Sequence, residues 1–381
     1  AGGFFAGFIM IRAIGLYPSG YLAAGINLVN VALVFLVVKS NISPAVRKTV
    51  MPEGSDVIHN QANTQKLPAN VMNLVLWVFT IEGFTTLAYE IIWSRILVDF
   101  SMDKTVYFSS VIIVGFVFGL GLGSLLVSRL LDRHRNLLAF LGINQILIGL
   151  LSIFLLLAFT WIAPKISAHR SMFGTWIHEA GREYLFFFLV LLPPVTLMGI
   201  TYPLVSKLAN NNIEKLGRKM GYLGFLDTIG SVLGSFVAGF IMVPFLGIVK
   251  SFVLVVLINL LLGSVIFIYH PFVKQRAKGG IIICTIILAG FMFWIMPKSP
   301  NTRSWWDKPS DKPWFDANQY TGIRFFDEGA AGTVTVRDYP DGLALNINGH
   351  NTAYATKKDL KVNRQLGYMP YLLHPSPKKA L

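Results

Sequence analysis

Long apolar runs separated by short polar loops dominate this sequence. A helix needs roughly 20 apolar residues to cross the hydrocarbon core of a bilayer, and about nine runs approach or exceed that length. They lie at 1–14, 17–38, 71–93, 105–128, 137–162, 184–207, 220–245, 250–269 and 280–296. Hydrophobic residues make up 54% of the chain and charged residues only 14%, which is unusual for soluble domains. We therefore predict an all-α polytopic membrane bundle.

The positive charge of the chain, +14 in total, is gathered in short loops. Basic residues follow the second, fourth, sixth and eighth runs, among them Lys48, Arg133, Arg135, Lys207, Lys215, Arg218, Lys219, Lys274 and Lys278. These loops all fall on one side, which the positive-inside rule makes cytoplasmic. This pattern reflects topology and excludes nucleic acid as a partner. We expect the lipid bilayer of a prokaryotic inner membrane to surround the chain.

Two segments of the chain resemble each other. GGFFAGFIM from Gly2 recurs as GSFVAGFIM from Gly234, and at the same spacing Gly15 aligns with Gly247 and Asn27 with Asn259. An even number of runs separates the copies, so they share one orientation, as in the parallel repeats of major-facilitator-like transporters. The first copy holds only the last two helices of such a unit. We therefore expect the chain to be a piece of a longer protein, truncated at both ends.

The chain then divides into five parts. We expect the last two helices of a first repeat at 1–38, a polar cytoplasmic linker at 39–70 and a six-helix second repeat at 71–270. A short basic loop and a final hydrophobic helix follow at 271–297, and a β-rich extramembrane tail at 298–381. In the tail, strands are predicted at 333–337 and 343–347 and a helix at 357–373. Parity places the tail outside, provided that the short last run crosses; a re-entrant helix there would return the tail to the cytoplasm.

Ionisable residues within the apolar runs are candidate functional groups, because a charge at the bilayer centre is costly. Glu82 and Glu90 lie in the third run with Arg95 near its end, and Asp227 lies in the seventh. A water-filled ion or proton path would explain them. Pairing with neighbouring helices, or an interfacial anchor at Glu90 and Arg95, would explain them equally well.

Small residues mark two helix faces. Gly115, Gly119 and Gly123 recur at four-residue spacing in the fourth run, and Gly234 and Gly239 lie in the seventh. Such faces let helix backbones approach closely, so we assign them to helix packing. Pro193, Pro194 and Pro203 are expected to kink or break the sixth run around Thr201. The histidines are dispersed, and no metal site is predicted.

Several segments in order resemble one known family. LAYEIIWSR, GFVFGLGLGS, MGITYPLVSKL, GYLGFLDTIGSVLGSFVAGFIMVPFLG, NINGHNTA and GYMPYLLHPSPKKAL look like the membrane-spanning spermidine/spermine synthase-like family. In that family a transporter-like helical bundle precedes an aminopropyltransferase-type domain. The resemblance covers most of the chain from about Val71, with the tail matching the start of the transferase domain.

The resemblance implies limited chemistry for this chain. In the soluble synthases the segment resembling MPYLLHPSPKKAL precedes the glycine-rich turn that holds decarboxylated S-adenosylmethionine, and Leu381 comes before that turn. We therefore expect no cofactor in this chain. The Tyr, Glu and His that the family associates with the polyamine pocket fall on Val362, Arg364 and Tyr368. A cation at Arg364 would repel a polyamine, and we assign no catalytic residues.

Three functions remain open from the sequence. The chain is a non-catalytic scaffold or subunit of a larger membrane complex, with other subunits as partners. Alternatively it is the membrane part of a tethered polyamine aminopropyltransferase whose cofactor domain lies beyond Leu381. A secondary transporter is the third hypothesis, based on the repeat and on Glu82, Glu90 and Asp227.

Overall fold

The computed structural model describes residues 5–39, 68–100, 106–131, 136–168, 176–209, 216–270, 275–295, 322–339, 342–348, 350–355 and 357–373. The first helices are η1 (Phe5–Met10), α2 (Ile11–Ile14) and α3 (Leu16–Lys39). The bundle follows with α5 (Ala69–Phe100), α6 (Val106–Leu131), α7 (Leu137–Ala168), α8 (Trp176–Ala209), α9 (Leu216–Val237), η3 (Ala238–Met242), α10 (Val243–Leu246), α11 (Ile248–Tyr269) and α12 (Gln275–Ile295). The tail holds strands β1 (Gly322–Glu328), β2 (Thr333–Tyr339), β3 (Gly342–Ile347) and β4 (His350–Tyr354), and helix α13 (Lys357–Leu373).

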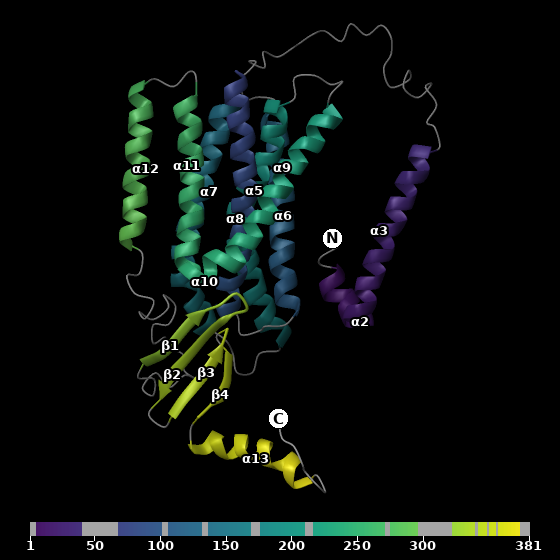
Figure 1. Ribbon diagram of the computed structural model, residues 1–381, viewed down its shortest axis with the longest axis vertical. Helices are drawn as coiled ribbons and strands as arrows, with labels where there is room; N and C mark the ends of the chain where they lie inside the picture. The colour runs from purple at the N-terminus through teal and green to yellow at the C-terminus, as the bar shows by residue number, and fades with distance from the viewer. Residues whose placement is uncertain are drawn as a thin grey trace.

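Six helical segments in the described ranges are long and apolar enough to cross a membrane. They are Ala69–Val98, Phe108–Ser128, Leu137–Phe159, Gly181–Ala209, Gly217–Leu246 and Ile248–Tyr269. Figure 1 shows these helices standing alongside one another as a bundle, with α12 next to α11. The predicted helical membrane bundle is confirmed to this extent. The count of nine spans and the major-facilitator-like repeat stay predictions, and residues 40–67 of the predicted linker lie outside the described residues.

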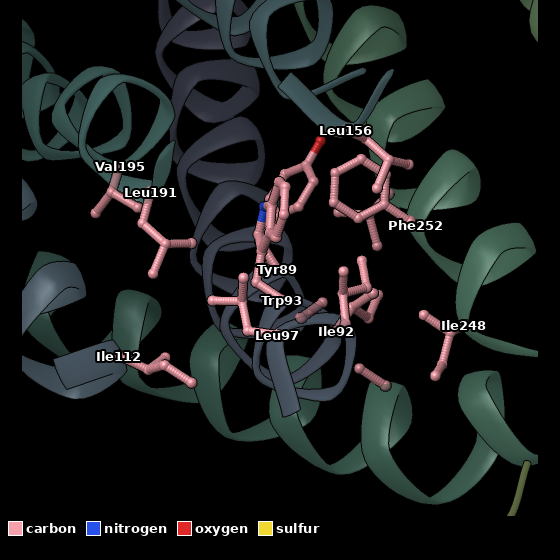
Figure 2. Close-up of a cluster of buried hydrophobic side chains, with 14 of the residues drawn as sticks. Tyr89, Ile92, Trp93, Leu97, Ile112, Leu156, Leu191, Val195, Ile248 and Phe252 are labelled. Atoms are coloured by element: carbon pink, nitrogen blue, oxygen red, sulfur yellow. The ribbon is translucent and has the colours of Figure 1, made fainter. Parts of the chain in front are cut away.

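Aromatic side chains fill one end of the bundle core. Tyr89 and Trp93 of α5 meet Phe252 of α11 edge to face, with ring centroids 5.4 and 5.3 Å apart, and Trp93 also meets Phe159 of α7 at 6.0 Å. Figure 2 shows Tyr89, Trp93 and Phe252 within the surrounding aliphatic side chains. Edge-to-face pairs at these separations are the favoured aromatic geometry. They fix α5 against α7 and α11.

Glycines allow two pairs of helices to touch backbone to backbone. A Cβ at Gly123 of α6 would overlap the carbonyl of Thr196 in α8, and a Cβ at Gly199 of α8 would overlap that of Leu120. On α9, a Cβ at Gly234 would overlap the carbonyl of Phe84 in α5. Contacts are looser at the other predicted packing positions. A Cβ at Gly119 would lie 2.9 Å from Val195, one at Gly115 would lie 3.6 Å from Leu191, and one at Gly239 would lie 3.8 Å from Ile91.

The prolines of α8 do not end the helix, which is continuous from Trp176 to Ala209, so the alternative of a broken run is wrong. Proline lacks an N–H, so Pro203 leaves the carbonyl of Gly199 without its usual helical donor. The hydroxyl of Ser124 in α6 donates to that carbonyl at 2.8 Å. A neighbouring helix thus satisfies the freed backbone group, which is how membrane helices tolerate proline.

The two similar sequence segments have the same local backbone pattern. A π-helical turn, η1 or η3, leads into a four-residue α-helix and then a glycine with φ of 83°, Gly15 or Gly247. A longer helix begins directly after each glycine, and its Ser19 or Ser251 hydroxyl donates to the glycine carbonyl at 2.6 Å. The correspondence covers these corners and the helices that follow them.

The tail contains a four-stranded antiparallel sheet in the order β1-β2-β3-β4. The small predicted sheet is confirmed, and the predicted helix at 357–373 is α13. Asn348, between β3 and β4, has φ of 52°, and its side chain accepts a 2.8 Å hydrogen bond from the N–H of Thr333 in β2. Strand β1 is an addition to the prediction. In Figure 1 the sheet lies at the end of the bundle where α10 turns into α11, and α13 lies beyond the sheet.

Candidate functional site

Glu82 lies inside the bundle on a face of α5 that also carries Thr85, Thr86 and Tyr89. The helical repeat of 3.6 residues brings these four positions to one side, and all four side chains are buried. Trp93 continues the same face toward the aromatic core. This polar stripe on an otherwise apolar helix points into the bundle rather than to lipid.

The carboxyl group of Glu82 lies near hydroxyl groups from two helices. The Thr86 hydroxyl donates to Glu82 Oε1 at 3.2 Å, one turn along α5. The side chain of Thr201, from α8, lies close enough to the same carboxyl group to interact with it electrostatically. No lysine or arginine in the described ranges forms an ion pair with Glu82, so its partners there are neutral hydroxyls.

Helix α7 adds two amide side chains to this group. Asn144 Nδ2 donates to the Thr201 hydroxyl at 3.1 Å and to the Leu197 carbonyl at 3.0 Å. Gln145 Nε2 lies 3.5 Å from the same hydroxyl. Both amides are fully buried, and Gln145 Oε1 has no hydrogen-bond partner in the described part of the chain. One hydroxyl thus links α7 to α8 and both to Glu82.

Asp227 approaches the group from α9. A Cβ on Gly83 would lie 2.9 Å from Asp227 Oδ1, which shows how closely the aspartate packs against α5. Its charge is near enough to Glu82 to interact with it electrostatically. Asp227 is half-buried, whereas only 4% of Glu82 is exposed. The structure thus brings together two of the predicted ionisable residues.

A second hydrogen-bonded set continues from Thr85 to α11. The Thr85 hydroxyl donates to the backbone carbonyl of Glu82 at 3.0 Å and lies 3.3 Å from Asn259 Oδ1. Asn259 Nδ2 in turn donates to the Tyr89 hydroxyl at 3.4 Å. We call Glu82, Thr86, Asn144, Gln145, Thr201 and Asp227 the polar cluster. Thr85, Tyr89 and Asn259 extend it toward the aromatic core.

Glu90 and Arg95 lie apart from the polar cluster. Glu90 is half-buried, and none of the described residues pairs with its side chain. Arg95 Nη2 donates instead to the backbone carbonyl of Ala330, between strands β1 and β2. Arg95 therefore joins the bundle to the sheet.

Glu328 makes a second contact between the sheet and the bundle. Its Oε2 accepts a 2.6 Å hydrogen bond from the N–H of Ile248, the first residue of α11. A Cβ at Gly247 would lie 2.6 Å from the same oxygen, so only glycine leaves room for it. Burial raises the pKa of the Glu328 carboxyl above its ordinary value, against the opposing effect of the Ile248 hydrogen bond. We call Arg95, Gly247, Ile248, Glu328 and Ala330 the docking contact.

Sequence reasoning missed most of the partners in both sites. The i, i+3, i+4, i+7 spacing of Glu82, Thr85, Thr86 and Tyr89 was a usable signal for a polar helix face. Nothing in the sequence pointed to Glu328, because its role depends on which helix end the sheet reaches. No group of three or more His, Cys, Asp or Glu suited to a metal ion occurs among the described residues.

Comparisons with known proteins find only a distant sequence similarity. No family model matches the chain, and no solved structure matches it significantly. A curated polyamine aminopropyltransferase from Oceanobacillus iheyensis is 24% identical over 226 residues. The match covers 58% of this chain but 41% of that protein, so the chain spans about two fifths of its relative's length. The spermidine synthase-like resemblance is supported only loosely by this match.

Proposed function

We propose that this chain is a membrane-embedded scaffold of spermidine synthase-like architecture that carries a docking helix at one face of the membrane. The observation behind the proposal is an uncovered apolar stripe on α13. Leu366, Met369 and Leu373 recur at helical spacing, and 66%, 54% and 75% of these residues is exposed. A stripe of this kind on an extramembrane helix suits a protein partner.

The docking contact gives the scaffold its rigidity. Arg95 near the end of α5 and Ile248 at the start of α11 both reach the β1 end of the sheet. Two attachment points on different helices restrict rotation of the sheet on the bundle. The sheet that precedes α13 would then be held in a defined position relative to the membrane.

The proposal places the sheet on the external side. Lys207 Nζ donates to the last carbonyl of α6, and Lys219 Nζ to the last carbonyl of α8, at 2.8 Å each. The last turns of α6 and α8 lie at the end of the bundle opposite the sheet (Figure 1). Because basic residues favour the cytoplasmic side, the opposite end would face outward.

A photo-cross-linking side chain at position 373 tests the scaffold function in native membranes. The expected result is one discrete cross-linked protein product from Leu373, and lipid adducts alone from Leu125, a 68% exposed residue of α6. The adduct should disappear when Leu366 and Met369 are both changed to Ser. Absence of any protein adduct at position 373 in correctly inserted protein would remove the scaffold proposal.

The second candidate is a membrane-tethered aminopropyltransferase, which the match to a polyamine aminopropyltransferase favours. The residues aligned with the family's polyamine pocket fit poorly. Arg364 and Tyr368 are exposed on α13, and Arg364 brings a positive charge where a polyamine would need a negative one. Binding of labelled decarboxylated S-adenosylmethionine by the full-length protein would support this candidate. If the full-length protein fails to bind the labelled cofactor and still forms the cross-link at position 373, the scaffold proposal stands and the transferase candidate is removed.

A further inference from the structure

The polar cluster supplies fewer hydrogen-bond donors than a buried carboxylate needs. Glu82 is enclosed by the bundle; the Thr86 hydroxyl donates to its carboxyl group, and the Thr201 hydroxyl lies nearby. Asp227 adds a second carboxylate. Burial of a carboxylate is costly unless a positive charge or several hydrogen bonds compensate it. Two neutral hydroxyls give only part of that compensation.

Gln145 gives an independent sign that something else belongs in the cluster. Its side chain is fully buried, and its Oε1 atom has no hydrogen-bond partner among the residues that the structure describes. The Nε2 atom of the same amide lies 3.5 Å from the Thr201 hydroxyl, which in turn lies near Glu82. The unpartnered oxygen is therefore on a group adjacent to the carboxylate. Buried polar atoms of this kind call for a missing ligand or water.

The types of ligand atom in the polar cluster narrow the choice of bound ion. The cluster offers carboxylate, hydroxyl and amide oxygens from four helices, with neither sulfur nor imidazole among its members. Oxygen ligands select hard cations over zinc or copper. Magnesium keeps several waters and calcium takes 6–8 oxygen ligands, which a closely packed bundle core does not favour. One carboxylate with neutral oxygens matches the charge of an alkali-metal ion.

We propose that Glu82, Thr86, Gln145 and Thr201 form an intramembrane site for a monovalent alkali-metal cation, with Asp227 adding a longer-range negative charge. The carboxylate neutralises the ion, and the hydroxyl and amide oxygens replace part of its hydration shell. The site joins α5, α7 and α8, so an occupied site stabilises the bundle. The proposal concerns binding alone and is independent of the scaffold function.

Thermal unfolding of the full chain in nanodiscs of zwitterionic lipid tests the site. Sodium, potassium and choline chlorides are compared at equal ionic strength, because a ligand that binds only the folded state raises the midpoint in a saturable way. The expected result is a saturable rise with sodium or potassium over choline. An equal response to all three salts, or a response to pH alone, would overturn the metal-ion site.

Variants test which side chains produce the rise in the unfolding midpoint with sodium or potassium. Glu82→Gln should abolish it, and Gln145→Met should weaken the apparent affinity about tenfold or more, as expected for one lost contact to a charge. Glu90→Gln, a change on the same helix outside the cluster, should leave the response unchanged. If Glu82→Gln fails to fold, Gln145→Met and Thr86→Val test the cation site in its place. A full wild-type response in both would refute the proposal.

Discussion

The backbone N–H of Ile248 donates a 2.6 Å hydrogen bond to the carboxyl group of Glu328, so the last residue of strand β1 caps the first turn of helix α11. The first N–H groups of a helix have no partner within it, and a negative side chain there also complements the helix dipole. This bond connects a membrane helix directly to the extramembrane sheet.

Replacement of Glu328 should separate the contribution of its hydrogen bond from that of its charge. Glu328→Leu removes the acceptor and should lower stability by about 1–3 kcal/mol, the cost of an unpaired buried donor. Glu328→Gln retains an acceptor oxygen and should cost less. Thermal unfolding of the purified protein measures both changes, and equal losses would show that the hydrogen bond does not matter.

The same carboxyl group predicts a pH dependence. Because burial raises the folded-state pKa of Glu328 above 4.5, its contribution is fully present below that pH and declines as pH rises through the folded value. The midpoint of unfolding should therefore fall more steeply from acidic to neutral pH in the wild type than in Glu328→Gln. Parallel curves for the two proteins would contradict the assignment.

Gly247 and Gly15 form a matched pair for mutation. Both have φ of 83°, a conformation that costs a residue with a side chain on the order of 1–3 kcal/mol. At Gly247 a new Cβ would also press on Glu328, whereas at Gly15 it would lie 4.0 Å from the nearest side-chain atom, in Pro18. Gly247→Ala should thus destabilise the protein more than Gly15→Ala and release the sheet. Limited proteolysis of the tail measures that release; equal cleavage in both variants would rule out the steric contact.

The crossing of α6 and α8 should be sensitive to one glycine and not to its neighbour. Gly123→Ala would push a methyl group into the Thr196 carbonyl, while a Cβ at Gly121 meets nothing within 4 Å. Gly123→Ala should cost about 1–3 kcal/mol through overpacking, and Gly121→Ala should be neutral or slightly stabilising. Unfolding in mixed micelles with increasing denaturing detergent compares the two, and equal stability would show that the crossing can relax.

The external position of the tail can be tested with the chain's single cysteine removed. In a Cys284→Ser background, Leu373→Cys should react with a membrane-impermeant maleimide on intact cells, because α13 is exposed. Arg218→Cys, at the basic end, should react only after the membrane is permeabilised. The reverse pattern would place the tail in the cytoplasm.

The helical bundle could be predicted because lipid imposes a length and a composition on each span. Apolar runs located the helices, whereas the assignment of the basic loops to the cytoplasmic side stays a prediction. Helix α13 and strands β2 and β3 follow from local pattern and turn residues. Strand β1 was missed because its segment, GIRFFDE, has charged residues on both sides of a short apolar pair and no strict alternation.

The sites were harder to predict because their contacts join distant parts of the chain. Glu82 stood out as a charge in an apolar run, but its link to Thr201 depends on how α5 packs against α8. For Pro203 the sequence left a kink or a break open, since the Ser124 hydroxyl that satisfies the freed Gly199 carbonyl comes from another helix. The local sequence shows which group needs a hydrogen-bond partner. Which residue provides that partner depends on how the helices pack.

The π-helical turn η3 determines the direction in which the corner at Gly247 points. A π-turn holds one residue more than an α-turn, and one residue of α-helix corresponds to about 100° of rotation. If the same residues of Ala238–Met242 were wound as α-helix, α10 and the corner would be turned by roughly that angle relative to α9. The Ile248 N–H would then face away from Glu328. The angular phase of one helix, set by one extra residue, thus decides whether the extramembrane sheet can make its contact with α11.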